Sequence, residues 1–305
     1  MKKAVLALSI AAIAASVYAF DSEASITTKG TVGSYTKTEY SVTQKFGDYY
    51  RSPKAKFTHN FASNGKETDS TELTSRDSVV DTVSYAYTSD GKLASKICTD
   101  ADGKVQWKFT YAYDVTGNLI DESAYNASDI LTDRTIWKYN GKQVDESYYN
   151  ADGALLGKII TKKDDSGRTS EVAKYDESGW LEVKQVYTYN DAGKLSEVAH
   201  LDYAGNQIKR VVYRFDSSYS ITEKQTYNME NKLCLREIYK YDSTGNVTKA
   251  TTYSVADKFG TTVNELVAIN EYAYKYGAGS GTLKTVSENK AATTSAASES
   301  AVDAK

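Results

Sequence analysis

The sequence predicts an all-β protein made of antiparallel strands, and three observations support this fold class. An aromatic residue recurs every 26 residues, a glycine follows it four residues later, and the residues between turns alternate between apolar and polar. Connections this short join only antiparallel neighbours, because a parallel connection needs a crossover of a dozen or more residues. The predicted topology is therefore an antiparallel β-meander formed by a tandem repeat.

The repeat contains two aromatic series, and each series marks the ends of strands. Successive positions of the first series are 26 residues apart except for one gap of 24, where Tyr139-Asn140-Gly141 has lost two turn residues. A second series follows the first by 12 residues, so that units of 12 and 14 residues alternate along the array. The first series consists of Phe61, Tyr87, Tyr113, Tyr139, Lys163, Tyr189, Phe215 and Tyr241.

The turns explain the spacing of the repeat. In residues 113–117, Asp114 can cap its own backbone and Gly117 tolerates a positive φ, which is typical of a type I turn closed by a left-handed glycine. In residues 105–113 every odd residue is apolar or aromatic, which indicates a strand with one face in water. We expect an elongated sheet that is twisted or curled, and the alternative is a closed hollow β-shell.

The chain divides into four segments. Lys2 and Lys3 precede an apolar stretch of about 14 residues, Ala4 to Val17, which is shorter than the ~20 residues of a membrane-spanning helix, and the small residue Ala19 marks the expected cleavage point. Residues 1–19 are therefore predicted to be a signal peptide of a bacterial type, which exports the chain to the periplasm or cell surface. Residues 20–56 are predicted to form capping strands, residues 57–286 the β-repeat array, and residues 287–305 a disordered tail.

Charge and residue usage limit the classes of partner. Without residues 1–19 the chain has 35 basic and 40 acidic residues, a net charge of −5, which argues against binding nucleic acid. His59 and His200 are the two histidines, so we expect no metal, no cofactor and no catalytic histidine. Neither strand face is apolar enough to meet lipid, so no transmembrane insertion is expected. Cys98 and Cys234 lie roughly 50 Å apart in an open meander and are expected to stay unpaired.

Aromatic and acidic side chains are the candidates for a binding face. Eight residues after each aromatic of the first series lies a mid-strand position that is acidic in six of eight repeats, and period-two alternation places it on the aromatic face. Three interpretations compete: a ladder in which tyrosine hydroxyls and lysines satisfy the acids, a glycan-binding face, and a catalytic carboxylate pair. The candidate binding residues are Tyr85, Tyr87, Trp107, Tyr111, Tyr113, Asp121, Trp137, Tyr139, Asp145, Glu171, Glu197 and Glu223.

The turn motif resembles that of a known repeat family. Tyr-Asp-Val-Thr-Gly-Asn-Leu at residues 113–119 and Tyr-Asp-Ser-Thr-Gly-Asn-Val at residues 241–247 resemble the YD repeat of Rhs-type proteins. The hairpins are also similar to MORN-type repeats, and the resemblance covers about two-thirds of the chain. It implies a β-sheet that spirals around a hollow, in some cases with carbohydrate binding or toxin encapsulation. This chain is shorter than a typical Rhs shell, and no toxin-like domain follows the array.

Together these observations predict a non-enzymatic, extracytoplasmic repeat scaffold that binds a glycan or a protein at the cell envelope. The alternative is a purely structural envelope component with no small-molecule ligand, in which the aromatics only hold the sheet together. A glycoside-active enzyme ranks third. Solvent exposure of the aromatic residues in the folded monomer would favour binding over the structural role.

Overall fold

The computed structural model describes residues 28–258 and 260–286, which form 19 β-strands. The predicted signal peptide and the predicted C-terminal tail lie outside these residues. No helix in the described part of the chain is long and apolar enough to cross a membrane. The strands are β1 Val32–Lys45, β2 Asp48–Phe61, β3 Glu67–Thr74, β4 Val79–Tyr87, β5 Leu93–Asp100, β6 Val105–Tyr113, β7 Leu119–Asn126, β8 Leu131–Asn140, β9 Gln143–Asn150, β10 Leu155–Lys163, β11 Thr169–Asp176, β12 Leu181–Tyr189, β13 Leu195–Asp202, β14 Gln207–Phe215, β15 Ile221–Tyr227, β16 Leu233–Tyr241, β17 Val247–Lys258, β18 Thr261–Tyr276 and β19 Lys284–Thr285.

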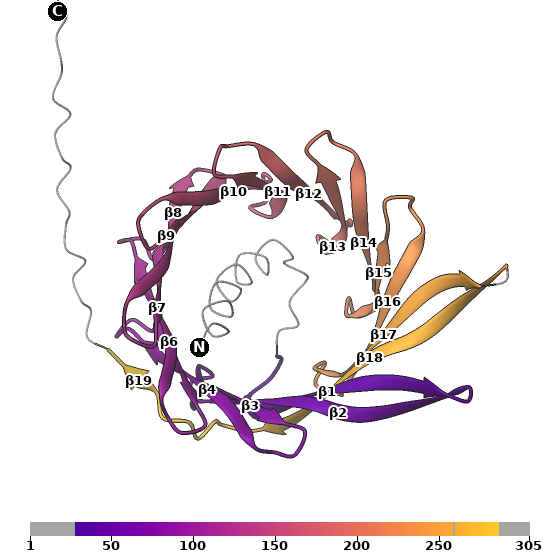
Figure 1. The fold of residues 1–305 in the computed structure, drawn as a ribbon, viewed down its shortest axis with the longest axis horizontal. Coiled ribbons are helices and arrows are strands. Elements are labelled where there is room, and N and C mark those ends of the chain that lie inside the picture. Colours follow the sequence, from indigo (N-terminus) through magenta and orange to yellow (C-terminus); the bar gives the residue numbers. More distant parts are fainter. Residues whose placement is uncertain (1–27, 259, 287–305) are drawn as a thin grey trace, which may run out of the picture.

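Strands β1 to β18 form one antiparallel sheet that closes on itself (Figure 1). Each strand pairs with its neighbour in sequence, and β1 also pairs with β18 from Val32–Tyr276 to Ser41–Ala268. The predicted antiparallel meander is therefore confirmed. The predicted elongated open sheet is wrong, because pairing between the first and last strands makes an 18-stranded β-barrel.

The closure has a local and a global cause. At the hairpin between β12 and β13, Thr188 pairs with Glu197 but Tyr189 pairs with Leu195, so Ser196 is an extra residue. Such a bulge bends the strand and increases its twist, and an equivalent register shift recurs at most hairpins. Closure also pairs backbone groups that two edge strands would leave open. Strands β1 and β2 therefore take part in the ring, in which β1 pairs with both β2 and β18.

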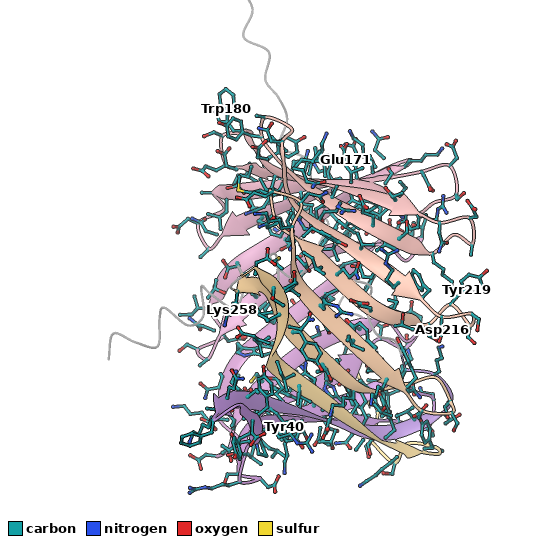
Figure 2. All side chains as sticks on the ribbon, turned by 90° about the vertical axis from the view of Figure 1, so that its right-hand side faces the viewer. Tyr40, Glu171, Trp180, Asp216, Tyr219 and Lys258 are labelled. Carbon is teal, nitrogen blue, oxygen red and sulfur yellow. The ribbon has the colours of Figure 1, made fainter. Side chains whose placement is uncertain are left out.

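The turns have the predicted chemistry. The carboxylate of Asp114 accepts hydrogen bonds from the backbone N–H groups of Thr116 and Asn118, at 2.9 and 2.8 Å. The N–H of Gly117 donates to the Asp114 carbonyl at 3.0 Å, with a φ of 91° at this glycine. We call the end of the barrel that carries these turns the first edge, and the end that carries the turns of the second aromatic series the second edge. Figure 2 shows Trp180 at the second edge and Asp216 and Tyr219 at the first.

Residues from both chain ends cross the seam between β1 and β18. Beyond β18, Gly281 donates its N–H to the Phe61 carbonyl at 3.0 Å, and β19 then pairs in parallel with β4. We call residues 277–286 the strap. From the other end, the backbone of Lys29 exchanges two hydrogen bonds with the Asn246 side chain, at 2.5 and 2.8 Å. The described segments before β1 and after β18 thus fasten strands on the far side of the seam.

The two faces of the sheet differ in burial, which identifies the inner face. Side chains converge on the concave side of a closed sheet and diverge on the convex side. Ile159 is 2% exposed and lies on the face of a buried cluster with Val172, Tyr187 and Val198, whereas Ile160 on the opposite face is partly exposed. The face of Ile159 is therefore the inner face. Eighteen strands at ~4.8 Å give a diameter of at least about 27 Å, and barrels of this size enclose space that side chains do not fill.

The cysteines do not report on closure. Cys98 on β5 and Cys234 on β16 are both free, as expected, yet the sheet is closed. Two free thiols therefore do not distinguish an open sheet from a closed one. The two strands lie in different parts of the ring, so closing the barrel does not bring these cysteines together (Figure 1).

Candidate functional site

The aromatic candidates lie on the inner face, where their hydroxyl groups bond to the chain itself. The Tyr113 hydroxyl donates to the Leu93 carbonyl, 20 residues earlier, at 2.9 Å. The same bond, to the carbonyl 20 residues earlier, recurs at distances from 2.6 to 2.9 Å at Tyr87, Tyr139, Tyr189 and Tyr241. We call this bond the tyrosine clamp. It joins the end of one strand to the start of the strand before it, so these hydroxyls stabilise the pairing of neighbouring strands.

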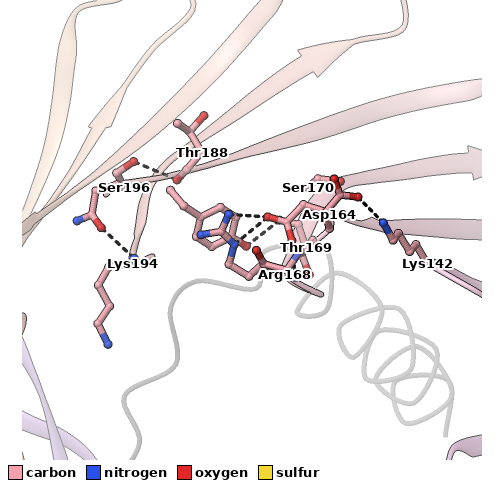
Figure 3. A network of polar contacts seen from close by, with 12 residues as sticks. Lys142, Asp164, Arg168, Thr169, Ser170, Thr188, Lys194 and Ser196 are labelled. Carbon is pink, nitrogen blue, oxygen red and sulfur yellow. Dashed lines mark hydrogen bonds and ion pairs between the residues drawn. The ribbon is translucent and has the colours of Figure 1, made fainter. Parts of the chain in front are cut away.

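Basic side chains cover several of the clamped rings. Lys66 lies 4.9 Å from the ring centre of Tyr87, and Arg168 lies 4.4 Å from that of Tyr189. Figure 3 shows the first edge of the barrel around Arg168, which also forms an ion pair with Asp164 at 2.7 Å. A cation over an aromatic face is attracted by the ring quadrupole. At these repeats the ring is therefore held at its hydroxyl and covered on a face.

The acidic candidates lie on the outer face, opposite the aromatics. Glu197 pairs across the strands with Thr188 and Val212, whereas Tyr187 pairs with Val198. The expectation that the acids share the aromatic face is wrong, because the bulge at Ser196 shifts the alternation by one residue between the aromatic and the acid. The two sets are separated by the thickness of the sheet.

Each of these acids forms an ion pair with a base 13 residues later, on the next strand. Glu197 meets Arg210 at 2.9 Å, and Glu223 meets Arg236 at 2.5 Å. The Arg236 hydrogen bond lowers the pKa of Glu223 below its usual range. Where the acidic position is Lys249, its partner is Glu271 at 3.2 Å, so the ladder continues with reversed charges. The remaining pairs are Asp121–Arg134, Asp145–Lys158 and Glu171–Lys184.

The inner face carries carboxylates that the sequence analysis missed, among them Glu122 and Glu146. Glu122 and Glu146 lie among aromatic side chains, with Glu122 paired across the strands with Tyr111 and Glu146 with Trp137. The Tyr148 hydroxyl donates to Glu146 at 2.7 Å. Burial raises the pKa of Glu122, although the hydrogen bond with Tyr111 and the charge of Lys96 oppose this. The sequence contains the information needed to find them. Each of these two acids directly follows one of the acidic candidates of the outer face, and it falls on the aromatic face once the bulge is counted.

The histidines and cysteines lie on four different strands, β2, β13, β5 and β16. His59 Nδ1 lies 2.5 Å from Glu67 and its ring stacks on Tyr35, while His200 contacts Gln185. Burial, followed by the nearby Asp81 carboxylate, raises the pKa of the Cys98 thiol to about 12, which suppresses the reactive thiolate. Within residues 28–258 and 260–286, no group of three His, Cys, Asp or Glu side chains is placed to hold a metal ion.

A polar cavity of about 420 Å³ lies between the strap and the starts of β1 and β3. Its lining includes Asp69, Lys275 and Ser280. Asp69 occupies the ladder position, but the residue 13 later is Thr82, and the Asp69 carboxylate accepts hydrogen bonds from Asn60 and Thr68 instead, at 2.7 and 2.8 Å. The strap approaches so closely that a Cβ at Gly279 would collide with the Phe61 carbonyl.

Comparisons with known proteins assign no family. No family model and no curated protein matches the chain. A porin-like protein from Bacteroides uniformis is 11% identical with a TM-score of 0.30, over 81% of this chain and 99% of that one. The Tc holotoxin pore of Photorhabdus luminescens is 12% identical with a TM-score of 0.24, over 77% and 16%. A LolA superfamily protein from Nitrosomonas europaea is 8% identical with a TM-score of 0.18, over 81% and 86%. These scores are too low to carry an argument about fold or function.

Proposed function

We propose that this chain is a non-enzymatic structural barrel of the bacterial cell envelope. One observation carries the proposal: the aromatic and acidic residues that would form a glycan-binding face lie on opposite faces and bond within the chain. The tyrosine hydroxyls hold backbone carbonyls, and the acids hold arginines and lysines. Within the described residues, every buried side-chain nitrogen and oxygen has a hydrogen-bond partner.

The environment of the proposed barrel is water. Its outer face carries ion pairs at mid-strand, whereas a barrel that spans a bilayer presents an apolar band about 25 Å tall there. The predicted signal peptide supports export. Fractionation of a bacterial host that expresses the full chain tests the location, and we expect soluble periplasmic or extracellular protein. Recovery in membranes that resist carbonate washing would contradict it.

Binding to a glycan array tests the structural role. We expect the mature chain to bind no glycan above the level of a heat-unfolded control. Trp137→Ala and Ile136→Ala form a matched pair, because these neighbours lie on the inner and outer faces. Saturable glycan binding that is lost in a folded Trp137→Ala variant and kept in Ile136→Ala would overturn the structural role and favour a binding face.

The strap cavity favours a second candidate function, the binding of a small polar molecule. Asp69 and Lys275 offer one charge of each sign there, with Ser280 as a hydroxyl partner. Thermal shifts with amino acids and monosaccharides test this candidate. A shift that disappears in Asp69→Asn, while Asp121→Asn keeps it, would support a site in the cavity, and no shift with any compound would remove the candidate.

A further inference from the structure

The two edges of the barrel differ in the apolar residues that they expose. At the second edge, six hairpins each present a large apolar side chain: Phe46, Ile130, Leu156, Trp180, Tyr203 and Met229. Four of these are more than 70% exposed. At the first edge, the large exposed apolar side chains are Val115 and Tyr219 in turns and the less exposed Tyr139, Tyr276 and Val286, each between 40 and 47%. The second edge therefore carries apolar contacts around most of the ring.

Phe46 is the residue that the fold explains least. It forms a two-residue turn with Gly47 between β1 and β2, and both residues have positive φ, 54° and 90°. Asn-Gly is the preferred pair for such a turn, and positive φ strains the backbone of a bulky residue. The Phe46 side chain is 102% exposed, so no neighbour among the described residues covers it. A contact with another molecule would offset this strain.

We infer that the second edge is the interface of an end-to-end dimer of this chain. The six side chains expose on the order of 700 Å², close to the ~800 Å² per partner that a standard interface buries. A twofold axis perpendicular to the barrel axis makes the same ring meet itself, which is the commonest form of protein dimer. This inference goes beyond the proposed structural role and does not depend on it.

Charge at the second edge favours a second copy over an anionic membrane. Its turns carry both signs at close spacing, as at Asp102 with Lys104 and at Glu230 with Lys232. Mixed charges can pair across a twofold interface, whereas an anionic surface would repel the acids. The described residues at both chain ends, Thr28 and Val286, lie toward the first edge, where Lys29 and the strap are fastened.

Sedimentation of the mature chain, residues 20–305, across micromolar concentrations tests the inference, and we expect a monomer–dimer equilibrium. Phe46→Asn should raise the dissociation constant at least about tenfold while it raises the melting temperature of the monomer, because Asn suits the turn. A merely structural role of Phe46 would not move the two readouts in this combination. The triple variant Trp180→Ser, Tyr203→Ser and Met229→Ser should remain monomeric.

Val115→Ser at the first edge is the matched control, because Val115 is 106% exposed in an equivalent hairpin, and its dissociation constant should not change. Three results would overturn the inference. The mature chain could be monomeric at every concentration, the triple variant could dimerise normally, or the control could lose the dimer. Flotation of a monomeric mature chain with phosphatidylcholine vesicles, lost in the triple variant, would assign the second edge to a lipid surface instead.

Discussion

The inner and outer faces of the barrel satisfy their polar groups in different ways. On the inner face, tyrosine rings pack closely and their hydroxyls reach backbone carbonyls, as at Tyr113. On the outer face, acids and bases pair across neighbouring strands in water, as at Glu197 and Arg210. Burial raises the pKa of Glu122 on the inner face. On the outer face, the hydrogen bond that Glu223 accepts from Arg236 lowers the pKa of Glu223. One 26-residue repeat thus builds two environments on the two sides of a single sheet.

Because the inner face is the better packed, we expect its side chains to contribute more to the free energy of unfolding than those of the outer face. Neighbouring isoleucines on β10 offer the sharpest test. We expect Ile159→Ala to lower the free energy of unfolding by about 2–4 kcal/mol, because Ile159 is 2% exposed and truncation leaves a cavity. Ile160→Ala should cost about 1 kcal/mol, because its environment is partly solvated. Urea titration measures both losses, and equal losses would mean that the inner face is not the better packed one.

The tyrosine clamp should have the next largest effect. Tyr113→Phe keeps the ring and removes the hydroxyl that reaches Leu93, so we expect a loss of about 1 kcal/mol. Phe215 occupies the same position in another repeat and has no hydroxyl. Phe215→Tyr should add a clamp to the Leu195 carbonyl and raise the melting temperature. If Tyr113→Phe does not change stability and Phe215→Tyr lowers it, the tyrosine clamp does not stabilise the barrel.

The sequence was sufficient for the parts of this fold that depend on neighbouring residues. The aromatic period and the Asp114–Gly117 chemistry place strands and turns, because a hairpin is specified within one repeat. Closure depends on pairing between β1 and β18, and a repeat encodes only the neighbour on either side. The closed shell was therefore weighed as an alternative, but nothing local favoured it over the open sheet.

The faces were predicted less well than the strands, for a geometric reason. Counting in twos from Tyr189 to Glu197 puts both on one face, but the bulge at Ser196 adds one residue to that count. The same error explains why Glu122 was missed. Asp121 was expected on the inner face, but the next residue, Glu122, lies there instead. Alternation is reliable within a strand and fails across a bulged turn.

The pH dependence of stability should have opposite signs on the two faces. The pKa of Glu122 is raised, so its ionised form is disfavoured in the folded state and its unfavourable effect appears as the pH rises above about 4.3. Glu122→Gln should therefore stabilise the protein at pH 7. The pKa of Glu223 is lowered, so its contribution is present above that pH and is lost as the pH falls through the folded pKa. Glu223→Gln should therefore destabilise the protein at pH 7.

Denaturation of these two variants at pH 7 and at pH 3 measures both effects. Near pH 3, where unfolded glutamate is protonated, both differences from the unmodified chain should become small. Each change is expected to be about 0.5–1.5 kcal/mol at pH 7. The same sign in both variants at pH 7 would show that the two faces do not differ in this respect.

The smallest effect is expected from a single step of the outer ladder. A double-mutant cycle of Glu197→Ala and Arg210→Ala should give a coupling of about 0.2–1 kcal/mol, because the pair is partly exposed and its Coulomb energy is weakened by water. The coupling should shrink further in 1 M salt, where the screening length falls to about 3 Å. Glu197→Lys alone places two cations diagonally across neighbouring strands and should destabilise the barrel. Adding Arg210→Glu should restore most of this loss, because Lys249 and Glu271 already form the reversed pair at 3.2 Å. If the double reversal is no more stable than Glu197→Lys alone, the outer pairs are not interchangeable, and the environment of each pair rather than charge alone fixes its orientation.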